Sequence, residues 1–272
     1  MSTVSPAVAL AGTKVTLSDT SNVSPALTST KLLYLAWTGT DTRLNVMSSP
    51  DGQNFGNKFT SDETSNVGPA ITPFGAGLYL FWTGTDTHLN VMSSPDGEWF
   101  GGKITLGDTS EVAPAATVFG TRLTLAWTGT DNRLNAMYST DGQGFTGKVT
   151  LGETSNVAPA AAAFKGRLYL AWTGTDSRLN VISSADGQSF SGKVTLGETS
   201  NVGPALAASG SQLCLAWTGT DGRLNTLWSP DGQSFGNKTT YSETSNVGPA
   251  VAGFQGGQIG AWTGTDTHLN VM

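Results

Sequence analysis

The 272-residue chain has one cysteine, two histidines and few charged side chains, and each shortage excludes a class of protein. The single thiol, Cys214, cannot form an internal disulfide, and together with two histidines it leaves no nitrogen–sulfur metal cluster. Charged residues make up 12% of the chain, against roughly 25% in ordinary domains. The net charge of −6 disfavours non-specific binding to nucleic acid. We therefore expect no metal, no cofactor and no nucleic-acid partner.

Long hydrophobic runs are also missing. No apolar run approaches the ~20 residues that cross a membrane, and no basic-then-apolar leader opens the chain. We therefore expect no membrane insertion. We also expect synthesis in the cytoplasm, which leaves later release from the cell open.

What the sequence has in abundance is repetition. The pentapeptide Trp-Thr-Gly-Thr-Asp occurs six times at intervals of 45 residues, and it begins at Trp37, Trp82, Trp127, Trp172, Trp217 and Trp262. A fixed period of this length is typical of a repeat architecture. It indicates one domain over residues 1–272 rather than two unrelated domains.

Each repeat predicts four β-strands and no helix. In the repeat that starts at Asn156 we expect strands over residues 160–164, 167–172, 179–184 and 192–196. Lys-Gly and Asp-Gly dipeptides between these runs are hairpin signals, because Gly accepts the positive φ of tight turns. The second run is apolar on both faces, as in a strand buried between two layers. The sequence therefore predicts an all-β fold, a six-bladed β-propeller with 45-residue, four-stranded blades.

The two ends of the sequence predict how the ring closes. The last repeat stops at Met272, the counterpart of Met47, so its fourth strand is missing. Residues 12–20 match the fourth-strand segment 192–199 with one residue inserted. We expect this N-terminal strand to complete the sixth blade, because closure removes exposed sheet edges.

A Ser-x-Asp-Gly-x-x-Phe segment lies between the third and fourth strands of five repeats. Its aspartates are Asp51, Asp96, Asp141, Asp186 and Asp231. The segment resembles the Asp-box of sialidase-like propellers, Ser-x-Asp-(x)-Gly-x-x-aromatic, in a shortened form with Gly directly after Asp. The sixth turn would fall near Ser5-Pro6-Ala7-Val8, where the Asp and Gly are absent. The resemblance implies a structural turn in which Asp accepts backbone N–H bonds and the aromatic packs into the blade. Calcium or ligand binding is the lesser alternative.

The Thr-Gly-Thr-Asp hairpin between the second and third strands carries the candidate binding residues. Its aspartates are Asp41, Asp86, Asp131, Asp176, Asp221 and Asp266. The asparagine four positions later is Asn45, Asn90, Asn135, Asn180, Asn225 or Asn270. Between them lies Arg43, Arg133, Arg178 or Arg223 in four repeats, and His88 or His268 in two. These groups can bind a polyhydroxylated ligand through paired hydrogen bonds. A salt bridge and turn lock within the blade is an equal alternative.

The loop between blades belongs to the same candidate site, because connections in an up-and-down blade alternate between the two faces. In four repeats its acid is Glu63, Glu153, Glu198 or Glu243, and in the others it is Asp19 or Asp108. We expect the nearby tryptophans to form the core between blades, and contact with a ligand is the alternative. If Thr40 pairs with Arg43, Trp37 lies opposite Val46 and faces the Arg/Asn side of the neighbouring blade.

Three classes of function compete for this surface. The sialidase resemblance implies a glycoside hydrolase with three arginines, a Tyr–Glu pair and an Asp, and no positions of this sequence match that set. Near-identical repeats offer the same environment six times, whereas catalysis needs different groups that converge. We therefore expect that the protein is not an enzyme. The chain is similar in architecture to bacterial propeller lectins, which implies a multivalent lectin with up to six glycan sites at blade junctions. Glycans or glycoconjugates would be its partners, and a symmetric scaffold without a ligand is the remaining alternative.

Overall fold

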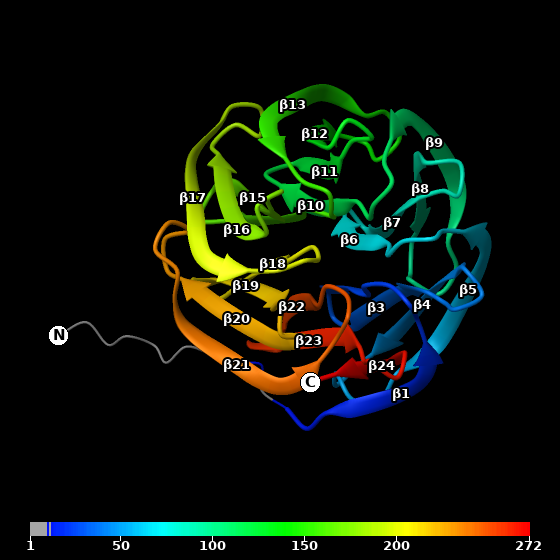
Figure 1. Ribbon diagram of the computed structural model, residues 1–272. Coiled ribbons are helices and arrows are strands. Elements are labelled where there is room, and N and C mark those ends of the chain that lie inside the picture. Colours follow the sequence, from blue (N-terminus) through cyan, green and yellow to red (C-terminus); the bar gives the residue numbers. More distant parts are fainter. Residues whose placement is uncertain (1–9, 11) are drawn as a thin grey trace.

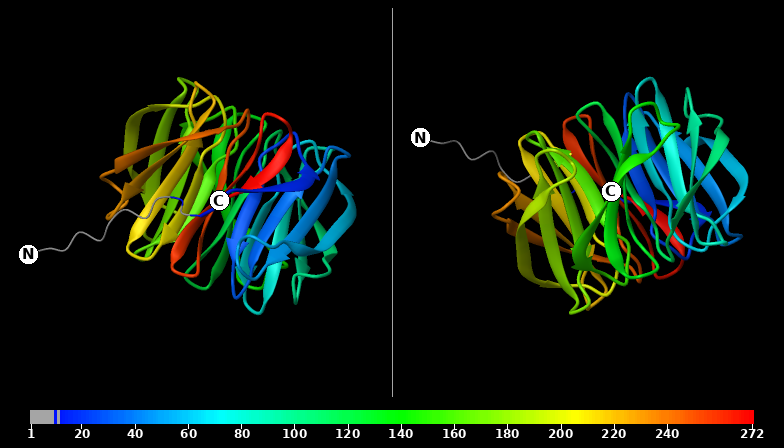
Figure 2. Two further views of the ribbon diagram at one scale, coloured as in Figure 1. Left: turned by 90° about the horizontal axis from the view of Figure 1, so that it is seen from below. Right: turned by 90° about the horizontal axis from the view of Figure 1, so that it is seen from above.

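The computed structural model describes Leu10 and residues 12–272, and within them it contains 24 strands and no helix (Figure 1). The strands form six antiparallel four-stranded sheets. These sheets are blades around a common axis, and the loops that connect their strands form the two faces of the ring (Figure 2). No helix that could cross a membrane occurs in these residues. The predicted all-β, six-bladed propeller is confirmed.

The strands follow the chain from the axis outwards in each blade. The first blade contains β2 (Ala26–Ser29), β3 (Leu33–Thr38), β4 (Arg43–Ser49) and β5 (Gly56–Thr64). The second contains β6 (Ala70–Phe74), β7 (Gly77–Thr83), β8 (His88–Ser94) and β9 (Gly101–Thr109). The third contains β10 (Ala115–Phe119), β11 (Arg122–Thr128), β12 (Arg133–Ser139) and β13 (Thr146–Thr154).

The remaining blades repeat this order, and the last takes a strand from the other end of the chain. The fourth contains β14 (Ala160–Phe164), β15 (Arg167–Thr173), β16 (Arg178–Ser184) and β17 (Phe190–Thr199). The fifth contains β18 (Ala205–Ser209), β19 (Gln212–Thr218), β20 (Arg223–Ser229) and β21 (Gly236–Thr244). The sixth contains β22 (Ala250–Phe254), β23 (Gly257–Thr263), β24 (His268–Val271) and β1 (Val15–Thr20).

The pairing of β1 with β24 closes the ring, as predicted. The two strands are antiparallel, with Val15 opposite Val271 and Thr16 opposite Asn270. Both termini of the sheet region therefore lie in the same blade (Figure 1). The sixth Ser-x-Asp-Gly position, Ser5-Pro6-Ala7-Val8, lies outside the described residues.

The expected register of the β3–β4 hairpin is wrong. Trp37 pairs with Asn45, and Val46 lies opposite Ala36. The reason is a bulged turn: the N–H of Thr42 donates to the carbonyl of Gly39 at 2.8 Å, and Thr42 adopts a left-handed φ of 67°. The bulge shifts the strands so that Trp37 and Asn45 lie on one face of their own blade. The other five hairpins have the same register.

The tryptophans form the inter-blade core, which confirms the first expectation for them. All six are 0–1% exposed. Trp37 packs against Ala261, Leu269 and Val271 of the sixth blade. Trp82, Trp127, Trp172 and Trp217 pack in the same way against the blade that precedes each of them. These five tryptophans therefore join their own blades to the preceding ones, and Trp262 is equally buried.

Leu10 fills the junction between the fifth and sixth blades. It lies four residues before Lys14, close to the position that a phenylalanine takes three residues before the equivalent lysines. Leu10 packs with Ala205, Ala216 and Val251. Gly260 stands where the other repeats have leucine, and a Cβ on it would lie 2.7 Å from Cδ1 of Leu10. The small residue in β23 therefore makes room for Leu10.

We predict that Gly260→Leu destabilises the protein by roughly 1–3 kcal/mol, because the new side chain competes with Leu10 for the same volume. In a Leu10→Ala background the same substitution should cost much less, since the competing side chain is gone. Urea unfolding of the four proteins in this double-mutant cycle measures the coupling. Additive effects would show that the two positions do not share a volume.

Candidate functional site

The hairpins and the blade-to-blade loops meet on one face of the ring, as expected. The N–H of Ser65 donates to the carbonyl of Thr42 in its own blade at 2.9 Å. The Ser65 hydroxyl donates to the carbonyl of Thr83 in the next blade at 2.7 Å. The same bonds recur from serines 21, 110, 155, 200 and 245. Each loop is thereby hydrogen-bonded to two hairpins, and the same bonds occur at every junction.

A pocket opens at the junction of the sixth and first blades. Its walls are Asp19 and Thr20 from β1, the hairpin residues Thr40 and Asp41, and the side chain of Lys58. Its volume is about 280 Å³, and the junction of the fifth and sixth blades holds an equivalent pocket of about 200 Å³. Both volumes lie below the roughly 300–1,000 Å³ that is usual for small-molecule sites.

A lysine that the sequence analysis missed lies in each junction. Nζ of Lys58 in β5 is 2.5 Å from Oδ1 of Asp19 in the sixth blade and 5.2 Å from the ring centre of Trp37. The equivalent ion pairs are Lys14–Glu243, Lys103–Glu63, Lys148–Asp108, Lys193–Glu153 and Lys238–Glu198. Each of these lysines also lies over the tryptophan of its own blade. The predicted loop acids are therefore in the pocket, and Asp19 and Asp108 take the same place as the four glutamates.

The signal for these lysines was present in the sequence. Five of the six follow one another at the 45-residue period, and Lys14 precedes Lys58 by 44 residues. Their side chains are 40–48% exposed. At such exposure an ion pair stabilises by about 0–1 kcal/mol and a cation–π contact by about 0.5–1 kcal/mol. The fold therefore depends little on them, and they are available to a ligand.

The hairpin aspartate and asparagine lock the turn. Oδ1 of Asp41 accepts the N–H of Arg43 at 3.1 Å. Asn45 donates to the carbonyl of Arg43 at 2.9 Å and accepts from the Thr60 hydroxyl at 2.7 Å. The turn lock that was the alternative to ligand contact is thus observed. Oδ2 of Asp41 makes no hydrogen bond with the described residues, and Asp41 lines the pocket.

The arginines and histidines of the hairpin lie beside the pockets rather than in their walls. Arg43 is exposed and reaches Asp62 of β5 at 3.7 Å, so the expected Asp41–Arg43 salt bridge is not formed. In the two histidine repeats, Nδ1 of His88 lies 3.4 Å from Oδ2 of Asp86, and Nδ1 of His268 lies 3.5 Å from Oδ2 of Asp266. The structure therefore brings the aspartate, asparagine, tryptophan and loop acid together and leaves Arg43 and His268 outside the pocket walls.

The tryptophan is only the floor of the pocket. Trp37 is 1% exposed, and the ammonium group of Lys58 lies over its ring. A ligand cannot stack on the indole while the lysine is in place. Polar contacts at the pocket therefore come from the lysine, the two carboxylates and the threonine hydroxyls.

The Ser-x-Asp-Gly turns lie on the opposite face and satisfy their own polar groups. Oδ1 of Asp231 accepts the N–H groups of Ser234 at 2.7 Å and Gln233 at 2.8 Å, and the Ser229 hydroxyl at 2.9 Å. These bonds, that from Ser234 first, lower the pKa of Asp231 to about 2. Among the described residues no group of three His, Cys, Asp or Glu side chains could hold a metal.

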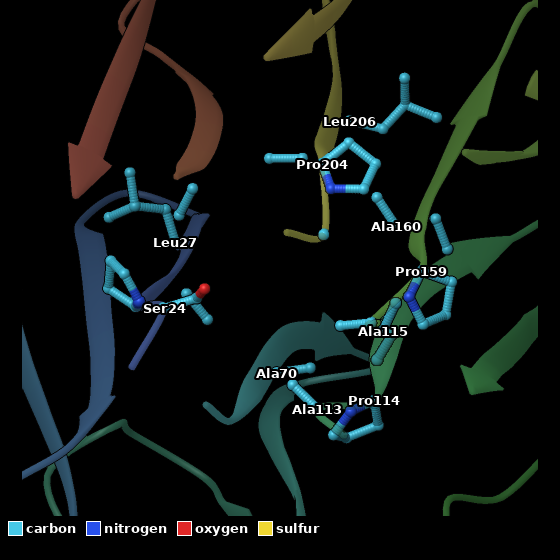
Figure 3. Close-up of a pocket in the computed structure, with 18 of the residues that line it drawn as sticks. Ser24, Leu27, Ala70, Ala113, Pro114, Ala115, Pro159, Ala160, Pro204 and Leu206 are labelled. Carbon is cyan, nitrogen blue, oxygen red and sulfur yellow. The ribbon is translucent and has the colours of Figure 1, made fainter. Parts of the chain in front are cut away.

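A third cavity lies on the axis. It has a volume of about 130 Å³ and is lined by prolines and small residues at the start of the innermost strands. Figure 3 shows Pro114, Pro159 and Pro204 beside Ala70, Ala115 and Ala160 at its wall. No charged side chain lines it. Among the described residues, the charged side chains that line cavities on this face are those of the junction pockets.

We predict that the protein loses stability as the pH falls from about 5 towards 2. A carboxylate whose folded pKa is depressed stabilises the fold above its ordinary pKa, and this contribution disappears as the pH falls through the folded value. The pKa is lowered in Asp51, Asp96, Asp141, Asp186 and Asp231. Scanning calorimetry at several pH values measures the effect. Replacing all five by Asn should lower Tm at pH 7 and flatten its acid dependence, and an unchanged slope would contradict the assignment.

Lectins and sialidases are among the solved structures that this chain resembles in fold. No protein-family model and no curated protein sequence matches the chain. The BP39L lectin from Burkholderia pseudomallei is similar in structure, with a TM-score of 0.66, 16% identity and coverage of 88% of this chain and 76% of that one. The Aleuria aurantia lectin, solved with alpha-methyl-L-fucoside, gives a TM-score of 0.64 at 10% identity over 91% and 89%. The Trypanosoma rangeli sialidase gives 0.62 at 13% identity, and this chain spans 54% of its length. At these identities the likeness shows the shared propeller fold.

Proposed function

We propose that the protein is a multivalent carbohydrate-binding lectin whose sites are the six blade junctions on the hairpin face. One observation carries the proposal: a lysine–acid pair, a hairpin aspartate and a tryptophan recur at every junction. A ring of equal, weak sites suits a target that presents many copies of one glycan, because avidity rises by roughly 10²–10⁴.

The free polar groups of a junction match the hydroxyls of a sugar. Lys58 uses one N–H in its ion pair and has further donors. Asp19 and Asp41 each accept one bond through Oδ1, which leaves Oδ2 as an acceptor. Thr20 and Thr40 approach to 3.2 Å across the junction and supply hydroxyls from both blades. A ring of sugar hydroxyls can reach both walls at once.

The lectin neighbours support this proposal, and two of them were solved with a methyl fucoside. We infer from the same fold that the Ser-x-Asp-Gly turns are a shortened Asp-box. A sialidase-like hydrolase is the second candidate, favoured by the likeness to the Trypanosoma rangeli enzyme. The repeated junctions count against it, because over the described residues the lysine–acid pair, the hairpin aspartate and the tryptophan recur at each. The hairpins differ in the exchange of Arg for His. A lectin of this kind would meet its glycans after release from the cell.

Titration calorimetry with methyl α-L-fucoside, together with a broad glycan array, tests the proposal. We expect several equivalent sites per chain, up to six, with one common Kd. Absence of binding across the array, or a single site per chain, would overturn the lectin assignment. Turnover of a fluorogenic sialoside that one substitution abolishes would favour the hydrolase instead.

A variant that alters one junction tests whether the lysine belongs to the binding site. We predict that Lys148→Met removes one site, because it deletes the ammonium group of one junction only. The stoichiometry should fall by one while the Kd of the remaining sites stays unchanged. Lys31→Met is the matched control, since Lys31 is exposed in the β2–β3 turn on the opposite face. If Lys148→Met binds as many ligands per chain as the wild type, the lysine lies outside the binding site.

A further inference from the structure

The two junction pockets described above each hold more negative than positive charge. At the junction of the sixth and first blades the wall contains the carboxylates of Asp19 and Asp41 and the single ammonium group of Lys58. At the junction of the fifth and sixth blades it contains Glu243, Asp266 and Lys14. In both pockets the lysine is paired with the loop acid, which leaves the hairpin aspartate outside that ion pair. Asp41 has no cationic partner among the described residues, and Asp266 has the imidazole of His268 at 3.5 Å.

The hairpin aspartate is well exposed and only partly used. The side chains of Asp86 and Asp266 are 65% exposed. In every repeat Oδ1 accepts the N–H of the residue two positions later, at 3.1–3.2 Å. In the arginine repeat described above, the guanidinium of Arg43 reaches Asp62 and leaves Asp41 without a cation. The carboxylate can therefore act on a ligand in the pocket.

The free hydrogen-bonding groups of the pocket wall are mostly acceptors, as its charges are mostly negative. The two carboxylates offer free oxygens, which only accept, while the lysine is the one cationic donor of the wall. A ligand satisfies this wall by donating, as sugar hydroxyls do. A carboxylate or sulfate on the ligand can only accept, and it would approach two negative groups.

We infer that the junction sites select glycans that end in an uncharged sugar and discriminate against sialic acid, uronic acids and sulfated sugars. The hairpin aspartates 41, 86, 131, 176, 221 and 266 are the specificity-determining residues. This inference rests on the proposed lectin function and names the class of sugar that its sites accept. It also separates this surface from a sialidase site, which must attract the carboxylate of its substrate.

A matched pair of glycans tests the inference: one neutral oligosaccharide that binds on the array, and the same oligosaccharide capped with sialic acid. We expect the sialylated form to bind at least about fivefold more weakly at low salt, the effect of one unit charge at contact distance. The difference should narrow at 0.5 M NaCl, because salt screens exposed charges. Equal or tighter binding of the sialylated glycan would overturn the inference while leaving the lectin function intact.

The variant that isolates the cause replaces all six hairpin aspartates by Asn. Asn keeps the acceptor of the turn bond, so the hairpins should persist. The preference for the neutral glycan should then fall by about fivefold. The matched control replaces Asp51, Asp96, Asp141, Asp186 and Asp231 by Asn, which lowers the net negative charge by a similar amount on the opposite face. Melting curves establish that both variants are folded.

The outcomes separate the two proposals. A loss of preference in the hairpin variant alone supports the inference. The same loss in both variants would show that overall charge, and not the pocket, sets the preference. If neither the neutral nor the sialylated glycan binds and the array is empty, the lectin function fails and the inference fails with it.

Discussion

The packing of the blade tryptophans against the preceding blades is the contact on which the rest of the structure depends. A propeller blade has two broad faces, and neither is covered until another blade lies against it. Trp37 and its counterparts are buried to 1% exposure or less and supply the large apolar surface that fills each junction. Because the tryptophan is in the second strand of every repeat, all blades meet in the same geometry.

The same constraint explains how the junction between the fifth and sixth blades is filled. The chain has five complete phenylalanine segments for six junctions, and Leu10 with Gly260 completes the set. The strand that follows Leu10 brings Lys14 to the fifth blade and Asp19 to the first. One N-terminal segment thus closes the sheet, fills the core and supplies polar groups to two junction pockets.

The symmetry that stabilises the ring also repeats the same surface groups in each blade. The blades follow one sequence repeat, and the lysine–acid pair above each tryptophan repeats with it. Such a surface offers equal sites rather than one unique centre, which suits repeated recognition better than catalysis. The opposite face carries turns whose carboxylates are already satisfied by backbone N–H groups, as in Asp231.

Much of the fold could be predicted from the sequence, because a strict period fixes blade number and an unpaired fourth strand fixes closure. The hairpin register was missed. The bulge depends on a left-handed φ at Thr42, a residue type that gives no such signal, although its counterparts Asn132 and Gly222 do. The lysines were also missed. They lie on the outer strands, whose sequence pattern predicts exposure to solvent. Their acidic partners belong to another blade, so only the closed ring brings Lys58 to Asp19. The loop acids, by contrast, could be placed near the hairpins from the alternation of turns.

The central claim is that one site has been copied around a ring. Native mass spectrometry of the protein with increasing concentrations of its best neutral glycan counts bound molecules directly. The account predicts a statistical series of complexes that extends to six ligands per chain, with intensities that fit one intrinsic Kd. A series that ends at one ligand, however high the concentration, would contradict it.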